Sequence, residues 1–248
     1  MGEQLLLSNI RSVLARLEET IIFELIERAQ FRRNDIIYRP GALGPALRGE
    51  SLVGFHLYEI EKVHARMRRY TSPDEHPFFP DLPGPLLPPL HYAENPLRPD
   101  SVNINPRIRA VYEKEIVPHV CRPGDDNQYG SSSMCDVTCL QALSKRIHYG
   151  KFVAESKFRA APSAFRELCV AGDAAGLMER ITDPEVEAGV LSRVALKAKT
   201  YCRELTDEGG KAKIDPRIVV DIYRRWIIPL NKDVQVAYLL ETASARDN

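Results

Sequence analysis

The sequence predicts an all-α fold, a single large helical domain over residues 1–248 with long helices and an ordered proline-rich loop. Three observations predict it. Apolar residues recur at spacings of three and four along most of the chain, as in helices with one buried face. No alternation of apolar and polar residues persists long enough to indicate a sheet. The prolines gather mainly in one stretch, which leaves most of the helical patterns free of them.

The first predicted helix extends to about Phe31. Its apolar stripe consists of Ile10, Val13, Leu14, Leu17, Ile21 and Leu25. Arg11 follows Ile10 and therefore lies about 100° around the helix, at the border of this stripe. A cation in that position can extend to solvent or lean into a pocket beside the core.

A second helix is predicted from Leu52 to Tyr70, and it ends in a basic cluster. Residues 73–106, which follow, contain ten prolines, a density that excludes a regular helix or a central strand. This stretch could be a flexible linker between domains. However, aromatic and leucine side chains such as Phe78 and Phe79 alternate with the prolines. We therefore expect a stiff, ordered loop that lies over a core.

Helical patterns resume after this loop. They cover about 105–121, 131–159, 163–171, 173–180, 184–205 and 216–243. Gly209 and Gly210 mark a loop, Pro216 suits the first turn of the last helix, and Pro229 is expected to kink that helix. Some of these helices are longer than a monomer of 28.0 kDa easily buries, so a dimer is expected.

Composition excludes several classes of function. Lys+Arg and Asp+Glu both total 34, so no net field favours nucleic acid or an anionic membrane. No apolar run approaches the roughly 20 residues of a membrane helix, and no targeting segment is evident, so we expect a cytoplasmic protein. The five cysteines form no CxxC pair, which argues against a disulfide framework and a zinc site. Neither a metal nor an organic cofactor is expected.

The segment from Leu143 to Phe158 is the most informative part of the chain. Read as one helix, it carries Arg146 and Lys157 eleven residues apart, and eleven steps of about 100° bring both cations to the same face. Gly150 and Val153 lie near the same line. Such a face suits a compact, anionic, partly apolar ligand, and the alternative is a solvated basic face.

Four segments resemble one enzyme family. They read SNIRSVLARLEETIIFELIERAQF, HARMRRYTSPDEHPFFPD, YGSSSMCDVTCLQALSKRIHYGKFVAESKF and IIPLNKDVQVAYLL, in family order across the chain. The sequence is similar to the all-helical chorismate mutases of fungi and plants. That resemblance implies conversion of chorismate to prephenate, the committed step toward phenylalanine and tyrosine, with no cofactor.

The resemblance also implies a role for each matching residue. Arg11 and Arg146 would clamp the two carboxylates of chorismate. Lys157 would bridge a carboxylate and the ether oxygen, Glu187 would accept a hydrogen bond from the ring hydroxyl, and Val153 would form a wall of the ring pocket. Arginine suits the clamp because its fork matches a carboxylate with two hydrogen bonds and stays charged.

Three positions of the expected substrate site depart from the fungal pattern. Gln235 stands where fungal relatives have a glutamate that must be protonated to donate to the ether oxygen. An amide donates at any pH, so we expect activity to stay nearly flat across neutral pH. Asp183 replaces an asparagine-like residue and Asn231 replaces a threonine. Asp183 adds a negative charge near a dianionic substrate. We expect it to affect the affinity for the substrate more than the type of reaction.

The resemblance further implies a regulated homodimer, inhibited by tyrosine and activated by tryptophan. Arg68 and Arg69 of one chain would hold the amino acid together with Gly130 and Ser131 of the other. The alternative for the two arginines is a basic helix end that complements the helix dipole. Met134 and Asp215 stand where the family has threonines, which weakens the expectation of an effector site.

Two other functions remain open at this point. The chain could be a catalytically weakened family member that binds aromatic metabolites as a regulatory dimer. The retention of Arg11, Arg146 and Lys157 argues against this. It could also be a helical scaffold without a small ligand, although inward-facing cations would then carry an unexplained desolvation cost.

Overall fold

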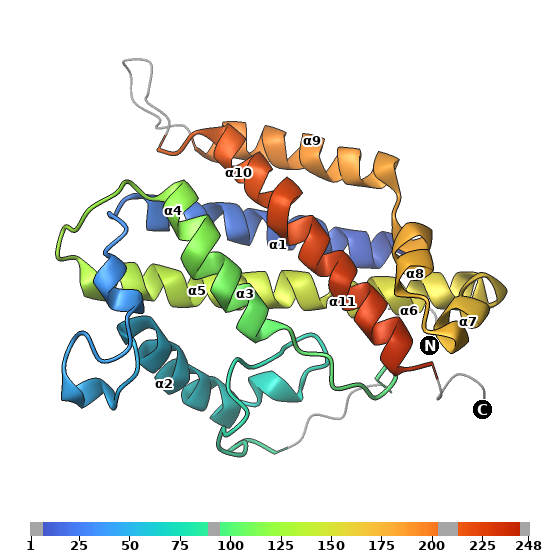
Figure 1. Cartoon of the computed structure of the whole chain (residues 1–248), viewed down its shortest axis with the longest axis horizontal. Coiled ribbons are helices and arrows are strands. Elements are labelled where there is room, and N and C mark those ends of the chain that lie inside the picture. Colours follow the sequence, from blue (N-terminus) through green and yellow to red (C-terminus); the bar gives the residue numbers. More distant parts are fainter. Residues whose placement is uncertain (1–6, 89–94, 203–212, 244–248) are drawn as a thin grey trace.

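The computed structural model describes residues 7–88, 95–202 and 213–243, and within these ranges its regular elements are helices (Figure 1). The predicted all-α class is confirmed. The α-helices are α1 (Leu7–Ala29), α2 (Leu52–Arg66), α3 (Asn105–Val111), α4 (Val117–Val120), α5 (Tyr129–His148), α6 (Gly150–Ala160), α7 (Pro162–Ala171), α8 (Ala174–Ile181), α9 (Pro184–Tyr201), α10 (Pro216–Ile222) and α11 (Ile228–Glu241). The described residues also contain three short 3₁₀ turns, η2 (Asp35–Tyr38), η3 (Pro45–Leu47) and η4 (Arg69–Thr71). Two π turns are η5 (Tyr112–Ile116) and η6 (Tyr223–Ile227).

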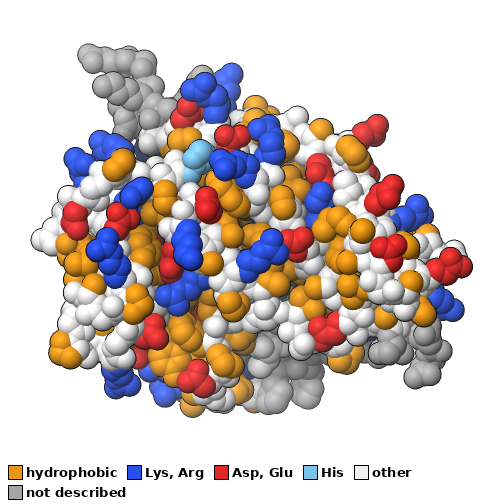
Figure 2. Space-filling view, in the orientation of Figure 1, with side chains coloured by type: hydrophobic (Ala, Val, Ile, Leu, Met, Phe, Trp, Pro, Cys, Tyr) orange, Lys and Arg blue, Asp and Glu red, His pale blue; other side chains and the backbone are white. Residues whose placement is uncertain are grey.

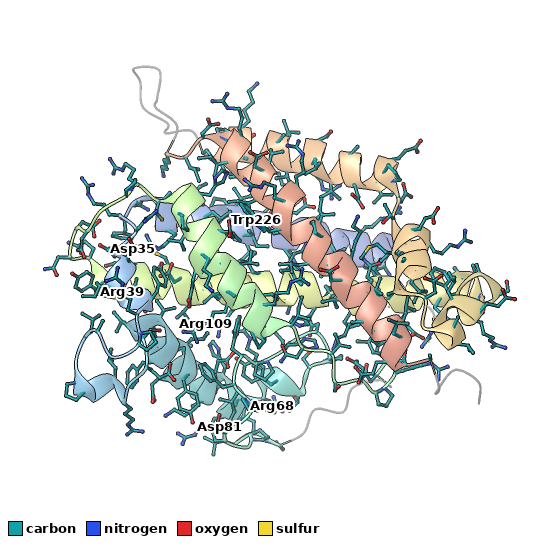
Figure 3. All side chains as sticks on the ribbon, viewed as in Figure 1. Asp35, Arg39, Arg68, Asp81, Arg109 and Trp226 are labelled. Carbon is teal, nitrogen blue, oxygen red and sulfur yellow. The ribbon has the colours of Figure 1, made fainter. Side chains whose placement is uncertain are left out.

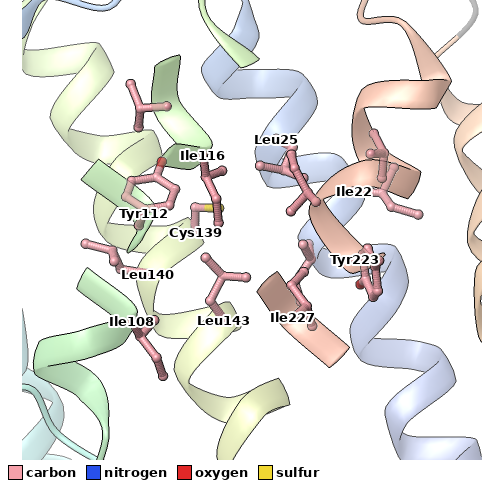
Figure 4. Close-up of a cluster of buried hydrophobic side chains, with 14 of the residues drawn as sticks. Ile22, Leu25, Ile108, Tyr112, Ile116, Cys139, Leu140, Leu143, Tyr223 and Ile227 are labelled. Carbon is pink, nitrogen blue, oxygen red and sulfur yellow. The ribbon is translucent and has the colours of Figure 1, made fainter. Parts of the chain in front are cut away.

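The helices α1 and α5 pack against each other through the middle of the molecule, and α11 crosses over them (Figure 1). Helix α9 packs on α1 and α10, while α6, α7 and α8 gather at the end where α11 finishes. One apolar core joins α1, α5, η5 and η6 (Figure 4). A second core joins α6, α7, α8 and the C-terminal half of α11. The space between these two cores is where the site described below lies.

Two helical segments pass through a proline without a break. Pro118 and Pro229 each come two residues after a π turn, η5 and η6 respectively. A π turn bonds each N–H to the carbonyl five residues back, which makes room for a ring that lacks an N–H. The first residues of the two turns, Tyr112 and Tyr223, are fully buried. The expected disturbance at Pro229 therefore takes the form of a π turn.

The segment from Leu143 to Phe158 is not one helix, contrary to the sequence-based prediction. Tyr149 separates α5 from α6, although its own backbone stays helical with φ −60° and ψ −11°. Gly150 does not belong to a ligand-binding face either. A Cβ added there would lie 2.6 Å from the backbone oxygen of Asn231, so this glycine permits the close approach of α6 and α11.

The predicted second helix is also too long. It ends at Arg66, and Arg68 has left-handed geometry with φ 69°. The proline-rich stretch does pack on the core through Phe78 and Phe79, as expected. Its backbone is tied to α2 because the buried carboxylate of Glu61 accepts hydrogen bonds from the N–H groups of both phenylalanines at 3.0–3.2 Å. The expected loop at Gly209–Gly210 lies outside the described residues.

The face of the molecule in Figure 2 carries basic and acidic side chains interspersed with each other. This distribution agrees with the formal net charge of zero. Within the described ranges, no helix combines the length and the apolar character needed to cross a membrane.

Candidate active site

A cavity of about 300 Å³ lies between the two cores and is bordered by α1, α5, α6, α9 and α11. Its size is that of a pocket for a small molecule. All eight residues predicted from the sequence as catalytic or substrate-binding line it. They are Arg11, Arg146, Val153, Lys157, Asp183, Glu187, Asn231 and Gln235. The structure therefore brings together side chains that are up to 224 positions apart in the sequence.

Arg146 is the most unusual of these residues. It is only 4% exposed, and its Nε and Nη1 atoms have no hydrogen-bond partner among the described residues. Burial lowers the pKa of its guanidinium, which still remains protonated at neutral pH. A buried cation with unpaired donors is costly unless an anion compensates it. Arg146 lines the cavity, which is the place where such an anion would bind.

Lys157 and Arg11 approach the cavity from two other helices. The Lys157 Nζ donates to the backbone carbonyl of Ile181 at the end of α8. Burial lowers the pKa of this ammonium, Arg11 lowers it as well, and Asp183 raises it. Arg11 is exposed at the mouth of the cavity, where it can reach a bound ligand from the solvent side.

The two acidic residues of the site are already engaged. Asp183 caps α9, since its Oδ1 accepts from the backbone N–H groups of Glu185 and Val186 at 3.1 Å. The positive end of the helix dipole compensates part of its charge there. This arrangement reduces the conflict expected between Asp183 and an anionic ligand. Glu187 pairs with Lys232 at 2.9 Å.

Asn231 and Gln235 form a buried polar pair on α11. The Asn231 Nδ2 donates to the backbone oxygens of Ile147 at 2.9 Å and Arg146 at 3.3 Å, at the end of α5. Its Oδ1 accepts from Gln235 Nε2 at 2.9 Å. The Gln235 Oε1 is buried without a partner among the described residues. Gln235 is thus held by a protein neighbour and still presents polar atoms to the cavity.

Sequence reasoning missed three residues of this region. Lys232 and Arg193 line the cavity as further cations. Arg193 is held by the fully buried Glu18 through hydrogen bonds of 2.8 Å and 2.6 Å. Glu18 could have been noticed, because it follows Leu17 on the buried side of the first helix, where a charge needs a partner. Lys232 gave no comparable signal.

The arrangement defines the chemistry that the cavity can support. Cations from α1, α5, α6, α9 and α11 surround a space whose walls include Ile10, Leu14 and Val153. Such a site can hold a small molecule with more than one negative group and an apolar body. Gln235 adds an amide that is neutral at every ordinary pH.

The expected effector residues lie elsewhere. Figure 3 labels Arg68 just beyond α2, on the side of the molecule away from α9. Arg68 donates to the carbonyl of Pro88, and Arg69 pairs with Glu75 at 2.9 Å and donates to Gln141 at 2.9 Å. Gln141 is about 15 Å along α5 from the predicted partners Gly130 and Ser131. The two halves of the expected site are therefore separated within one chain.

Comparisons with known proteins agree with each other. The family profile described as Chorismate mutase type II matches residues 128–236. Chorismate mutase 1, chloroplastic, from Petunia hybrida is 47% identical over 96% of this chain and 76% of its own length. The chorismate mutase of Schizosaccharomyces pombe is 46% identical over 97% of both chains.

Solved structures give the same result. The chorismate mutase Aro7p of Candida albicans in complex with L-Trp superimposes with a TM-score of 0.89 at 40% identity, over 95% of this chain and 91% of that chain. AtCM1 with tyrosine bound in its allosteric site gives a TM-score of 0.88 at 48% identity, over 96% and 97% of the two chains.

Proposed function

This chain belongs to the chorismate mutase family, and on that premise we propose that it rearranges chorismate to prephenate in the cavity between its two cores. The observation that carries the assignment of this cavity is the buried guanidinium of Arg146. This residue lines the cavity together with further cations, and its Nε and Nη1 have no hydrogen-bond partner among the described residues. Chorismate carries two carboxylates on a compact, partly apolar frame, which matches that environment.

The reaction is an intramolecular [3,3] shift in which a C–O bond breaks while a C–C bond forms. It requires no nucleophile and no base, so the protein acts by restraining conformation and by stabilising charge. Arg11 and Arg146, on different helices, would hold the two carboxylates and bring the reacting carbons together. Val153 would limit the space available to the extended conformer.

Negative charge grows on the ether oxygen as the C–O bond breaks. Lys157 and the Gln235 amide would donate to this oxygen, and preorganised donors of this kind contribute most to such a transition state. Glu187 would accept from the ring hydroxyl. Its pairing with Lys232 supports this role, because the ion pair orients the carboxylate.

The test is the loss of chorismate absorbance with the purified protein. Arg146→Ala is expected to lower kcat/KM by about 10²–10³, because it removes a buried cation that clamps a carboxylate of the substrate. Helicity and molecular mass should not change. Arg166→Ala is the matched control, since Arg166 is an exposed arginine of α7 outside the cavity, and its activity should equal that of the wild type. Equal activity of the Arg146 variant would reject the proposed site.

The alternative is a weakened family member that only binds aromatic metabolites. It predicts that the wild type binds prephenate but leaves chorismate absorbance unchanged. The engagement of Asp183 as a helix cap favours the active enzyme, because the feature expected to weaken binding is compensated locally.

We also propose that the enzyme is a homodimer that binds an aromatic amino acid between protomers. Arg68 and Arg69 of one chain would bind the carboxylate, and Gly130 and Ser131 of the other would complete the site. The separation of these two groups within one chain supports a site shared by two chains. Relatives have been solved with tryptophan, phenylalanine and tyrosine, the last two in an allosteric site.

Sedimentation would establish the dimer, and titration of tyrosine and tryptophan at subsaturating chorismate would establish the regulation. Arg68→Ala should abolish the response while the unregulated rate persists. No response of the wild type to either amino acid at millimolar concentration would reject the effector site. A cytoplasmic location is likewise a proposal, since the petunia relative is described as chloroplastic, and cell fractionation would test it.

A further inference from the structure

We propose that Asn231 is a positioning residue for Gln235: by capping the end of α5 it fixes which side of the Gln235 amide is presented to the substrate. Only the catalytic part of this inference, that the Gln235 amide meets the substrate, rests on the proposed function. The orientation of the amide follows from contacts within the chain.

The side chain of Asn231 caps the end of α5. A helix leaves its last carbonyl groups without intrahelical partners. Where α5 stops at His148, the side-chain Nδ2 of Asn231 donates to the carbonyls of Ile147 and Arg146 at 2.9 Å and 3.3 Å. Asn231 reaches them because Gly150 has no Cβ, which would otherwise lie 2.9 Å from Nδ2.

The contacts of Asn231 with α5 leave the amide one orientation. Since Nδ2 donates to two carbonyls at the end of α5, Oδ1 is left to the other side, where it can only accept. Rotating the amide by half a turn would place Oδ1 against two carbonyl oxygens and lose both hydrogen bonds. Asn231 is therefore fixed as an acceptor toward α11.

Gln235 lies one helical turn after Asn231 on α11. Since Asn231 presents an acceptor, Gln235 must turn its Nε2 toward it, and the two atoms are 2.9 Å apart. One N–H is consumed, and the second N–H and Oε1 remain for the cavity. Oε1 is buried without a partner among the described residues, and Gln235 lines the cavity. The side chain that donates to the ether oxygen is thus oriented by the backbone end of the helix that carries Arg146.

A carboxyl group at position 235 reports this orientation. In Gln235→Glu, the new carboxyl group lies next to the acceptor Oδ1 of Asn231, and it can donate a hydrogen bond to this oxygen only while it is protonated. Removing the acceptor with Asn231→Ala in the same background should then lower the carboxyl pKa by about one unit. If Asn231 instead offered its N–H, the same removal would raise the pKa. The other charged groups around the cavity are identical in both variants, namely Arg11, Arg146, Lys157, Asp183, Glu187, Arg193 and Lys232.

The experiment follows the carboxyl introduced by Gln235→Glu with ¹³C NMR and, separately, with the pH dependence of kcat. A fall in the carboxyl pKa on removal of Asn231 supports the proposal. A rise, or no change, overturns it. The NMR readout needs no turnover, so an inactive wild type would reject the proposed function without affecting this test. The single variant Asn231→Ala should lower kcat about tenfold with KM within about threefold, because the donor is misplaced more than binding is lost.

Two controls separate positioning from stability. Ser51→Ala removes the cap of α2, where Ser51 accepts from Gly54 N at 3.0 Å, and should lower stability without altering kcat. If the double variant does not fold, hydrogen exchange of the side-chain amides in the wild type still tests the proposal. Both Asn231 side-chain hydrogens and only one Gln235 hydrogen should exchange slowly with solvent, and the reverse pattern would overturn the proposal.

Discussion

Gly150 offers the most direct test of the packing that shapes the site. In Gly150→Ala, the new Cβ would lie 2.6 Å from the Asn231 backbone oxygen and 2.9 Å from its Nδ2. Contacts below 3.0 Å are essentially absent from real structures, so α6 and α11 must separate by at least about 0.4 Å. A backbone oxygen cannot swing aside as a flexible side chain can. The methyl group therefore strains the contact between the two helices that carry Lys157 and Gln235.

The expected size of the effect follows from two opposing contributions. Overpacking of this kind destabilises by about 1–3 kcal/mol. Alanine gains up to about 1 kcal/mol over glycine in a helix. We therefore expect a net loss of about 1–2 kcal/mol, which corresponds to a fall in Tm of about 2–8 °C for a chain of this size.

Urea and thermal unfolding, followed by circular dichroism, measure this difference. Gly189→Ala is the matched control, because Gly189 lies within α9 and its Cβ would meet nothing within 4 Å. That variant should be more stable than the wild type by about 0.5–1 kcal/mol. If Gly150→Ala is as stable as the wild type, the helices are not packed as closely as described and the reasoning fails.

Three further predictions concern the charges and the polar contacts. Activity should change little between about pH 6 and pH 8, because the Gln235 amide does not titrate; a steep loss in an intact fold would contradict its role. Stability should fall as the pH drops below about 6.5, because burial lowers the pKa of His76 to about 2 and that of His148 to about 4, so the unfolded chain takes up these protons first. Each histidine lowers the free energy of unfolding by up to about 1.4 kcal/mol per pH unit between about pH 6.5 and pH 4. The urea midpoint, measured at several pH values, follows this loss. An unchanged midpoint would refute the assignment. Glu18→Ala should lower the free energy of unfolding by about 1–3 kcal/mol, because it removes the buried partner of Arg193. Glu19→Ala, a variant of the more exposed neighbour, should change it by less than about 0.5 kcal/mol. Equal losses in the two variants would contradict the role of Glu18.

The sequence alone determined the helices and much of the list of site residues. Helical periodicity depends on local spacing, so the long patterns were recognisable without knowledge of their neighbours. The same spacing placed Arg146 and Lys157 on one face, and both line the cavity although Tyr149 interrupts the helix. The similarity to known sequences then supplied the residues on the other helices.

The tertiary structure decided the contacts that join separate helices. Gly150 faces Asn231 rather than a ligand, Glu18 holds Arg193, and the Asn231 amide has one orientation. No local pattern encodes these contacts, because each depends on which atoms of a distant segment come within about 3 Å. Hydrogen bonds and close packing act only at that range, so the sequence names the side chains while the fold determines what each of them touches.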